Sequence, residues 1–117
     1  MASNDVTAFS TSDKRLKQNI TNIDSALDKV AKLNGVEFDW RPLSEDERNT
    51  IHSHTGHDVG VIAQEVEQVL PEAVQTRQNG YKAVDHDKIV PLLIEAIKEQ
   101  QSQIEQLKQQ VEQLQQL

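Results

Sequence analysis

The chain has 117 residues, of which 36% are hydrophobic and 26% charged, and its formal net charge is -7 at pH 7. This length fits one compact domain. The acidic balance argues against a nucleic-acid partner, because phosphate binding needs an excess of Lys and Arg. The lack of cysteine excludes disulfides and a thiol nucleophile, and without a run of about 18 apolar residues we expect no membrane partner.

Residues 1–11 are polar and have no period, and we interpret them as the end of a larger preceding region. After them, apolar residues at helical spacing predict a short helix, which Asn22 or Asp24 caps and Gly35 ends. Apolar and polar residues alternate over 36–40, which predicts a half-buried strand.

Residues 41–58 predict a long loop without regular structure, which we expect to form a mobile or protruding arm. His52, His54 and His57, with Asp58, are the candidates for a metal site, but their spacing matches no zinc signature. We therefore expect no metal. Since the chain also lacks a glycine-rich phosphate loop, we expect no cofactor.

The second half of the chain begins with a short predicted strand at 59–61, followed by an amphipathic helix that ends at Pro71. Asn79-Gly80, between two runs of alternating residues, is the strongest short hairpin signal in the sequence. Asp85 or Asp87 then caps a last helix, which we expect to continue to the C-terminus.

This last helix carries a heptad repeat over four heptads. Beyond Lys98 the flanking positions are polar and rich in Gln, which favours association of the helix with copies of itself. Branched residues at a with Leu at d favour dimers, whereas Gln100 at a d position weakens that preference without selecting three strands. The a and d residues are Val90, Leu93, Ile97, Gln100, Ile104, Leu107, Val111 and Leu114.

Ser12 and Lys17 are candidates for a nucleophile and its general base. A free lysine is charged at neutral pH, so a basic amine requires desolvation or nearby positive charge. A separation of five residues places the two side chains on different faces of a helix or a strand. Either the segment turns between them, or the lysine comes from a neighbouring subunit; as isolated residues, both are simply solvated loop positions.

Five segments, taken together and in order, resemble the intramolecular chaperone of endosialidases and other phage tail proteins (peptidase family S74). Each segment alone is a weak signal, but the set extends over nearly all of residues 12–114. The matching segments are 12–20, 35–40, 60–66, 71–74 and 90–98.

The resemblance implies a module at the end of a tail fibre or tailspike that assembles as a homotrimer, assists folding of the preceding region of the same polypeptide, and then releases itself. Carried over to this chain, it implies a self-cleaving serine endopeptidase that cuts once at Thr11–Ser12, with Ser12 as nucleophile and Lys17 as base. Asp13 is a candidate for orienting Lys17. The resemblance also implies that the chain is part of a virion tail precursor made in the host cytoplasm. After cleavage the module would be released from the mature fibre.

We therefore expect an α+β fold with a small antiparallel sheet, short helices and a long C-terminal helix that forms a parallel trimeric coiled coil. The expected divisions are 1–11 for the released fibre end, 12–95 for the globular domain and 96–117 for the coil, within a helix that starts near residue 87. Two alternatives remain open: a structural trimerisation module that does not cut, and a cellular coiled-coil adaptor.

Overall fold

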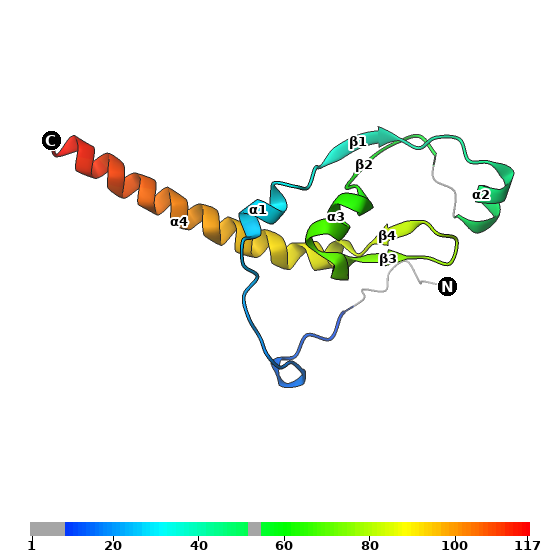
Figure 1. The fold of residues 1–117 in the computed structure, drawn as a ribbon, viewed down its shortest axis with the longest axis horizontal. Coiled ribbons are helices and arrows are strands. Elements are labelled where there is room, and N and C mark those ends of the chain that lie inside the picture. Colours follow the sequence, from blue (N-terminus) through cyan, green and yellow to red (C-terminus); the bar gives the residue numbers. More distant parts are fainter. Residues whose placement is uncertain (1–8, 52–54) are drawn as a thin grey trace.

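The computed structural model describes residues 9–51 and 55–117, and its dominant feature is one long C-terminal helix that projects from a small α+β body (Figure 1). The predicted fold class is confirmed. In chain order, the elements are η2 (Lys14–Leu16), α1 (Ala26–Val30), β1 (Val36–Asp39), α2 (Glu45–Thr50), β2 (His57–Gly60), α3 (Ala63–Val69), η3 (Pro71–Ala73), β3 (Val74–Thr76), β4 (Lys82–Val84), η4 (His86–Lys88) and α4 (Ile89–Gln115).

The body is held together by a small apolar core around the first turns of α4. One face of that helix buries Ile89, Leu92 and Ala96, and α1 packs on the same face through Ala26. Val66 of α3 and Ala73 of η3 form a second buried cluster with Ile89. The half-buried side chains of Leu33 and Leu70 contact both clusters and join them into one core.

The short helix α1 depends on α4 for its start. Ser25, at its N-cap position, has a left-handed backbone with φ of 50° and makes no side-chain cap. Instead, the Glu99 carboxylate of α4 accepts hydrogen bonds from the backbone N–H of Ala26 at 2.8 Å and of Leu27 at 3.1 Å. A carboxylate at a helix N-terminus satisfies free N–H groups and complements the helix dipole. The predicted helix is therefore present but shorter than expected.

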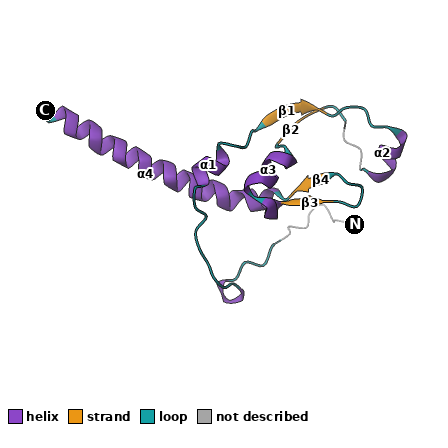
Figure 2. Cartoon of the chain, in the orientation of Figure 1, coloured by secondary structure: helices purple, strands orange, loops and turns teal. Residues whose placement is uncertain are grey.

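Among the described residues, the strands form two separate two-stranded antiparallel sheets, where the sequence predicted one small sheet (Figure 2). In the first, β1 pairs with β2, with Val36 opposite Gly60. In the second, β3 pairs with β4, so the predicted hairpin is confirmed. Its turn closes through a bond from Gly80 N–H to the Arg77 carbonyl, and Gly80 has φ of 87°, a conformation that glycine adopts without strain.

The expectation of an irregular loop over 41–58 is wrong, because this segment contains α2 and the start of β2. The Ser44 hydroxyl accepts from the backbone N–H of Glu47, and the Glu47 carboxylate accepts from the backbone N–H of Ser44. This reciprocal capping box stabilises the first turn of a helix. The Ser-x-x-Glu pattern of this capping box is visible in the sequence, and it is a local signal for the start of α2.

The molecule is elongated, with a radius of gyration of 20.1 Å and a longest extent of 70 Å. A compact chain of this length would have a radius of gyration of about 13 Å. The distal half of α4 accounts for much of the difference, since from Gln100 onward it extends free of the body (Figure 1). None of the helices within residues 9–51 and 55–117 combines the length and apolarity of a membrane span.

Candidate functional site

The segment that carries the predicted cutting pair lies away from the body. In Figure 1 it forms the blue loop that hangs from the start of α1, with η2 at its far end. All residues from 9 to 22 are exposed, and the apolar side chain of Leu16 is 75% exposed. Asn22 joins the segment to α4 by donating a hydrogen bond to the Glu95 carboxylate at 3.0 Å.

The structure brings Ser12 and Lys17 together within one chain. The Lys17 Nζ donates a hydrogen bond to the Ser12 Oγ at a distance of 2.7 Å. Between the two residues, η2 turns the backbone, with Lys17 N–H donating to the Lys14 carbonyl at 3.0 Å. Of the two arrangements that the sequence allowed, a turn between the residues is therefore the one observed in this chain.

Asp13 lies between the two candidate residues but binds elsewhere. Its carboxylate caps η2 by accepting from the Arg15 backbone N–H at 2.9 Å, and it also pairs with the Arg15 guanidinium, whose Nη2 lies 2.9 Å from Oδ2. The hydrogen bonds from the Arg15 side chain and backbone hold the pKa of Asp13 below its ordinary value. Direct orientation of Lys17 by Asp13 stays a prediction.

This geometry has the elements of a serine nucleophile and a lysine base. A hydroxyl within hydrogen-bond reach of an amine can pass its proton to that amine when the amine is neutral. Both residues are exposed in the single chain.

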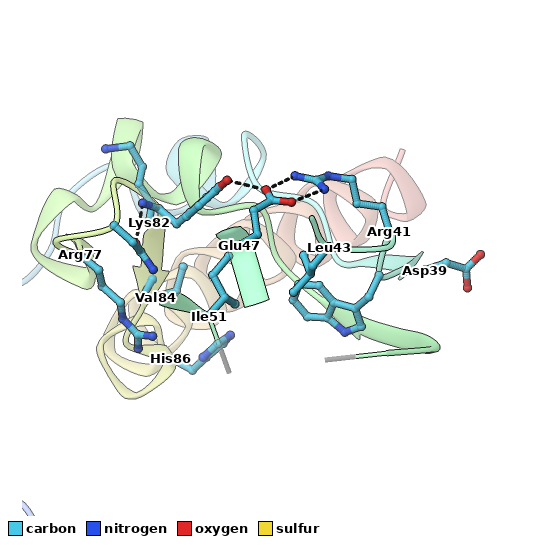
Figure 3. Close-up of a pocket in the computed structure, with 13 residues that line it drawn as sticks. Asp39, Arg41, Leu43, Glu47, Ile51, Arg77, Lys82, Val84 and His86 are labelled. Carbon is cyan, nitrogen blue, oxygen red and sulfur yellow. Dashed lines mark hydrogen bonds and ion pairs between the residues drawn. The ribbon is translucent and has the colours of Figure 1, made fainter. Parts of the chain in front are cut away.

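A second cluster joins the tip of the arm to the β3–β4 hairpin, and sequence reasoning did not predict it. The Arg41 guanidinium pairs with the Glu47 carboxylate at 2.6 Å (Figure 3), and the Tyr81 hydroxyl donates to the same carboxylate at 2.6 Å. These two partners, Arg41 first, hold the pKa of Glu47 far below its ordinary value. Asn79 adds a bond to the Thr50 carbonyl at 3.1 Å.

Beside this cluster lies a pocket of about 610 Å³, open to solvent between α2 and the hairpin (Figure 3). Its lining combines apolar side chains, Leu43 and Ile51 among them, with the cationic groups of Arg77 and Lys82. The contacts of Glu47 with Tyr81 and of Thr50 with Asn79 mean that α2 is docked on the hairpin in this structure.

The histidine candidates divide between described and undescribed residues. His57 lies on β2, where its Nδ1 is 2.9 Å from Asp39 and its Nε2 is 3.2 Å from Glu37. Hydrogen bonds to Asp39 and then to Glu37 raise the pKa of His57 above its ordinary value. Within the described ranges no group of three or more potential metal ligands occurs, while His52 and His54 lie outside those ranges.

The a and d positions of α4 form an apolar stripe that the chain itself leaves uncovered. The stripe lies on a different face from the buried residues of the core, and its members are at least 42% exposed where they are apolar. A shallow hollow of about 360 Å³ lies along its distal part, between Ile104 and Glu112. Such a face on a free helix is typical of a coiled coil without its partner strands.

Comparison with known proteins identifies the family of this chain. The family model described as "chaperone of endosialidase" matches residues 12–75, a range that begins at Ser12 and includes Lys17. The chain belongs to the endosialidase chaperone family. The match includes the segment that carries Ser12 and Lys17, the arm and α3, so the resemblance noted from the five sequence segments is confirmed.

Curated relatives of this endosialidase chaperone domain are phage tail proteins. The long tail fiber proteins Gp37 of Enterobacteria phages K3 and T2 are each 37% identical over 101 residues, or 83% of this chain. The Gp37 protein of Enterobacteria phage M1 is 35% identical over the same share. The chain spans 8% of the length of the K3 protein, 7% of the T2 protein and 38% of the M1 protein.

Proposed function

We propose that this chain is an intramolecular chaperone that trimerises, assists assembly of a phage tail fibre or tailspike, and then cuts itself off at Thr11–Ser12. In this proposal residues 1–11 are the released end of the fibre region, residues 12–95 are the working domain, and residues 96–117 are the coil. The observation that carries the catalytic part is the 2.7 Å contact between Lys17 Nζ and Ser12 Oγ. Family membership and the tail-fibre relatives support the chaperone part.

The proposed reaction begins with an acyl shift within the scissile bond. The Ser12 Oγ attacks the carbonyl carbon of Thr11 while neutral Lys17 accepts the hydroxyl proton. The C–N bond then breaks, Lys17 returns the proton to the departing Ser12 nitrogen, and an ester joins Thr11 to Ser12. Water hydrolyses the ester, giving a carboxylate at Thr11 and a free amino terminus and hydroxyl at Ser12.

In this proposal, trimerisation is the step by which the module assists fibre assembly. A coil of three α4 helices holds three fibre chains at high local concentration and in register, which reduces the entropic barrier to pairing strands that are distant in sequence. Ser12 and Lys17 are exposed in the single chain, and in this proposal assembly covers them and so couples cleavage to trimerisation. Release then leaves the mature fibre kinetically stable, because its unfolding route no longer includes the helper.

A second candidate is a structural trimerisation module without cleavage. The observation that favours it is the full exposure of residues 9–22, because no described part of the chain desolvates the lysine. This candidate keeps the coil and the fibre partner, and it gives Ser12 and Lys17 no chemical role.

The two candidates are separated by cleavage assays on matched variants. Ser12→Ala, Lys17→Ala and Lys17→Arg should each abolish cutting, the last because a guanidinium does not release its proton at any accessible pH. Ser10→Ala and Gln18→Ala, which change other exposed residues of the same segment, should cut at the parental rate. All five variants should sediment like the parent, because surface substitutions of this kind change stability little.

Two results would contradict parts of this proposal. If the Ser12→Ala variant is cut as fast as the parent, Ser12 is not the nucleophile. If neither the parent nor any control variant is cut while all of them trimerise, the structural module replaces the self-cleaving one.

A further inference from the structure

The turn that brings Ser12 to Lys17 is held by side-chain contacts and not by burial. Every residue of η2 and of its flanks is exposed. Two backbone hydrogen bonds close the turn, from Leu16 N–H to the Asp13 carbonyl and from Lys17 N–H to the Lys14 carbonyl. The remaining support is the Asp13 carboxylate, whose two oxygens take three hydrogen bonds from Arg15.

The same contacts determine the position of the Asp13 carboxylate. Asp13 directly follows Ser12, whose Oγ lies 2.7 Å from the Lys17 Nζ. A free carboxylate there would stabilise the charged amine and so oppose its use as a base. The bidentate pairing with the Arg15 guanidinium, with Nε at 3.1 Å and Nη2 at 2.9 Å, occupies both oxygens.

Asp13 is the only carboxylate within residues 9–22. The other charged side chains of that segment, besides Lys17, are Lys14 and Arg15, both cations that disfavour a further positive charge. From the helix that the segment contacts, α4, Glu95 binds Asn22 and Lys98. Asp13 is therefore the carboxylate of the segment that carries Ser12 and Lys17.

We propose that Asp13 and Arg15 form a clamp that fixes the η2 turn and keeps the Asp13 carboxylate away from the Lys17 amine. The proposal rests on the proposed function, since it concerns the base of the same reaction. Asp13 and Arg15 are positioning residues in this account: they act on the reaction through Lys17. Arg15 matters because it neutralises and holds Asp13, and Asp13 matters chiefly as the cap of the turn.

The test is the pH dependence of cleavage in full-length variants. Arg15→Gln should release the carboxylate, move the pH of half-maximal cleavage upward and slow the reaction about tenfold at pH 7. The double variant Asp13→Asn with Arg15→Gln should return the midpoint to the parental pH, because Asn still caps a helix but carries no charge. Lys14→Gln is the matched control: it removes one cation from the same turn without freeing Asp13, and its shift should be clearly smaller.

The outcomes that overturn the clamp differ from those that overturn the proposed function. Uniform slowing of Arg15→Gln at every pH, or a Lys14→Gln shift as large as that of Arg15→Gln, would overturn the clamp while leaving self-cleavage intact. An uncut parent chain at every pH would overturn self-cleavage itself. In that case the NMR titration of the Lys17 side chain in a Ser12→Ala background still decides: Arg15→Gln must raise its midpoint, and an unchanged midpoint overturns the clamp.

Discussion

At the scale of single residues, carboxylates provide the caps of this molecule. Asp13 caps η2, Asp85 caps η4, and Glu47 completes the capping box of α2. Glu99 performs the same task for α1 from a distant part of the chain. Short helices have a high proportion of unpaired backbone N–H groups, so an acidic chain with short helices can use its carboxylates in this way.

At the same scale, one histidine is held by two carboxylates. His57 lies between Asp39 and Glu37, with Asp58 also close, and these carboxylates raise the pKa of the imidazole. A raised pKa means that the charged form stabilises the folded arm. This contribution is fully present below the unfolded value of about 6.5 and is lost as pH rises through the higher folded value.

We therefore expect the His57 ring to titrate in NMR with a midpoint above 6.5, and Asp39→Asn to lower that midpoint. The stabilising effect of His57 relative to His57→Gln should be present at pH 6 and should decline as pH rises past the midpoint. His86→Gln, which changes a histidine outside β2, serves as the control. A His57 midpoint at or below 6.5 would contradict the arrangement of the β1–β2 sheet.

At the scale of elements, the last helix has two faces with different tasks. Ile89, Leu92 and Ala96 pack on the body, while the a and d residues face solvent. The coiled coil and its order are part of the proposed function. Three strands, rather than two, rest on the family resemblance, since the a and d residues by themselves favour two.

A coiled coil through the a and d positions predicts that a charge at an a position affects assembly differently from the same charge on the outward face of α4. Ile104→Asp places a charge at an a position, where association would bury it without a partner, and should dissociate the assembly. Gln109→Asp adds the same charge at an outward position and should leave the assembly intact. Sedimentation equilibrium reports both. Dissociation by both variants or by neither would mean that the heptad face is not the association surface.

Sequence periodicity predicted the elements that depend on local pattern. The long helix, the strand at 36–39, the helix ending before Pro71 and the hairpin were all anticipated, because their spacing or turn residues are local signals. The contacts of Glu99 with α1, and of Glu47 with Tyr81, link residues far apart in sequence, and no local pattern encodes them. The helix α2 has a local signal in its capping box, but its residues are all polar and show no apolar period.

The candidate site shows the same division. The residue types and spacing of Ser12 and Lys17 gave the pair as candidates, but a regular helix or strand would have separated the side chains. The contact arises from the turn η2, in which Asp13 pairs with Arg15. The bidentate pairing of Asp13 with Arg15 is not indicated by residue spacing alone, and direct orientation of Lys17 by Asp13 stays a prediction.

At the scale of the whole molecule, the buried core is small, the a and d stripe of α4 is uncovered, and the segment that carries Ser12 and Lys17 lies free of the body. A domain of this size gains little stability from its own core, and oligomerisation is a common remedy. The account therefore connects assembly, covering of the segment and cleavage in that order.

Whether the cut occurs within one chain is decided by mixing. Because Lys17 contacts Ser12 of the same chain, mixed trimers of Ser12→Ala and Lys17→Ala chains should stay uncut. Chains that retain Ser12 but lack Lys17 have no base within reach in this arrangement. Cutting of those chains in the mixture would show that a neighbouring subunit supplies the lysine.

The most direct test of the central claim is the intact mass of the purified chain during incubation, measured together with that of Ser12→Ala. The account predicts that the mass of the parent falls by that of residues 1–11, giving a product that begins at Ser12, at a rate independent of concentration once the trimer has formed. Ser12→Ala should keep its full mass under the same conditions. A parent chain that keeps its full mass as a stable trimer, or a product that begins at any other residue, would contradict the account.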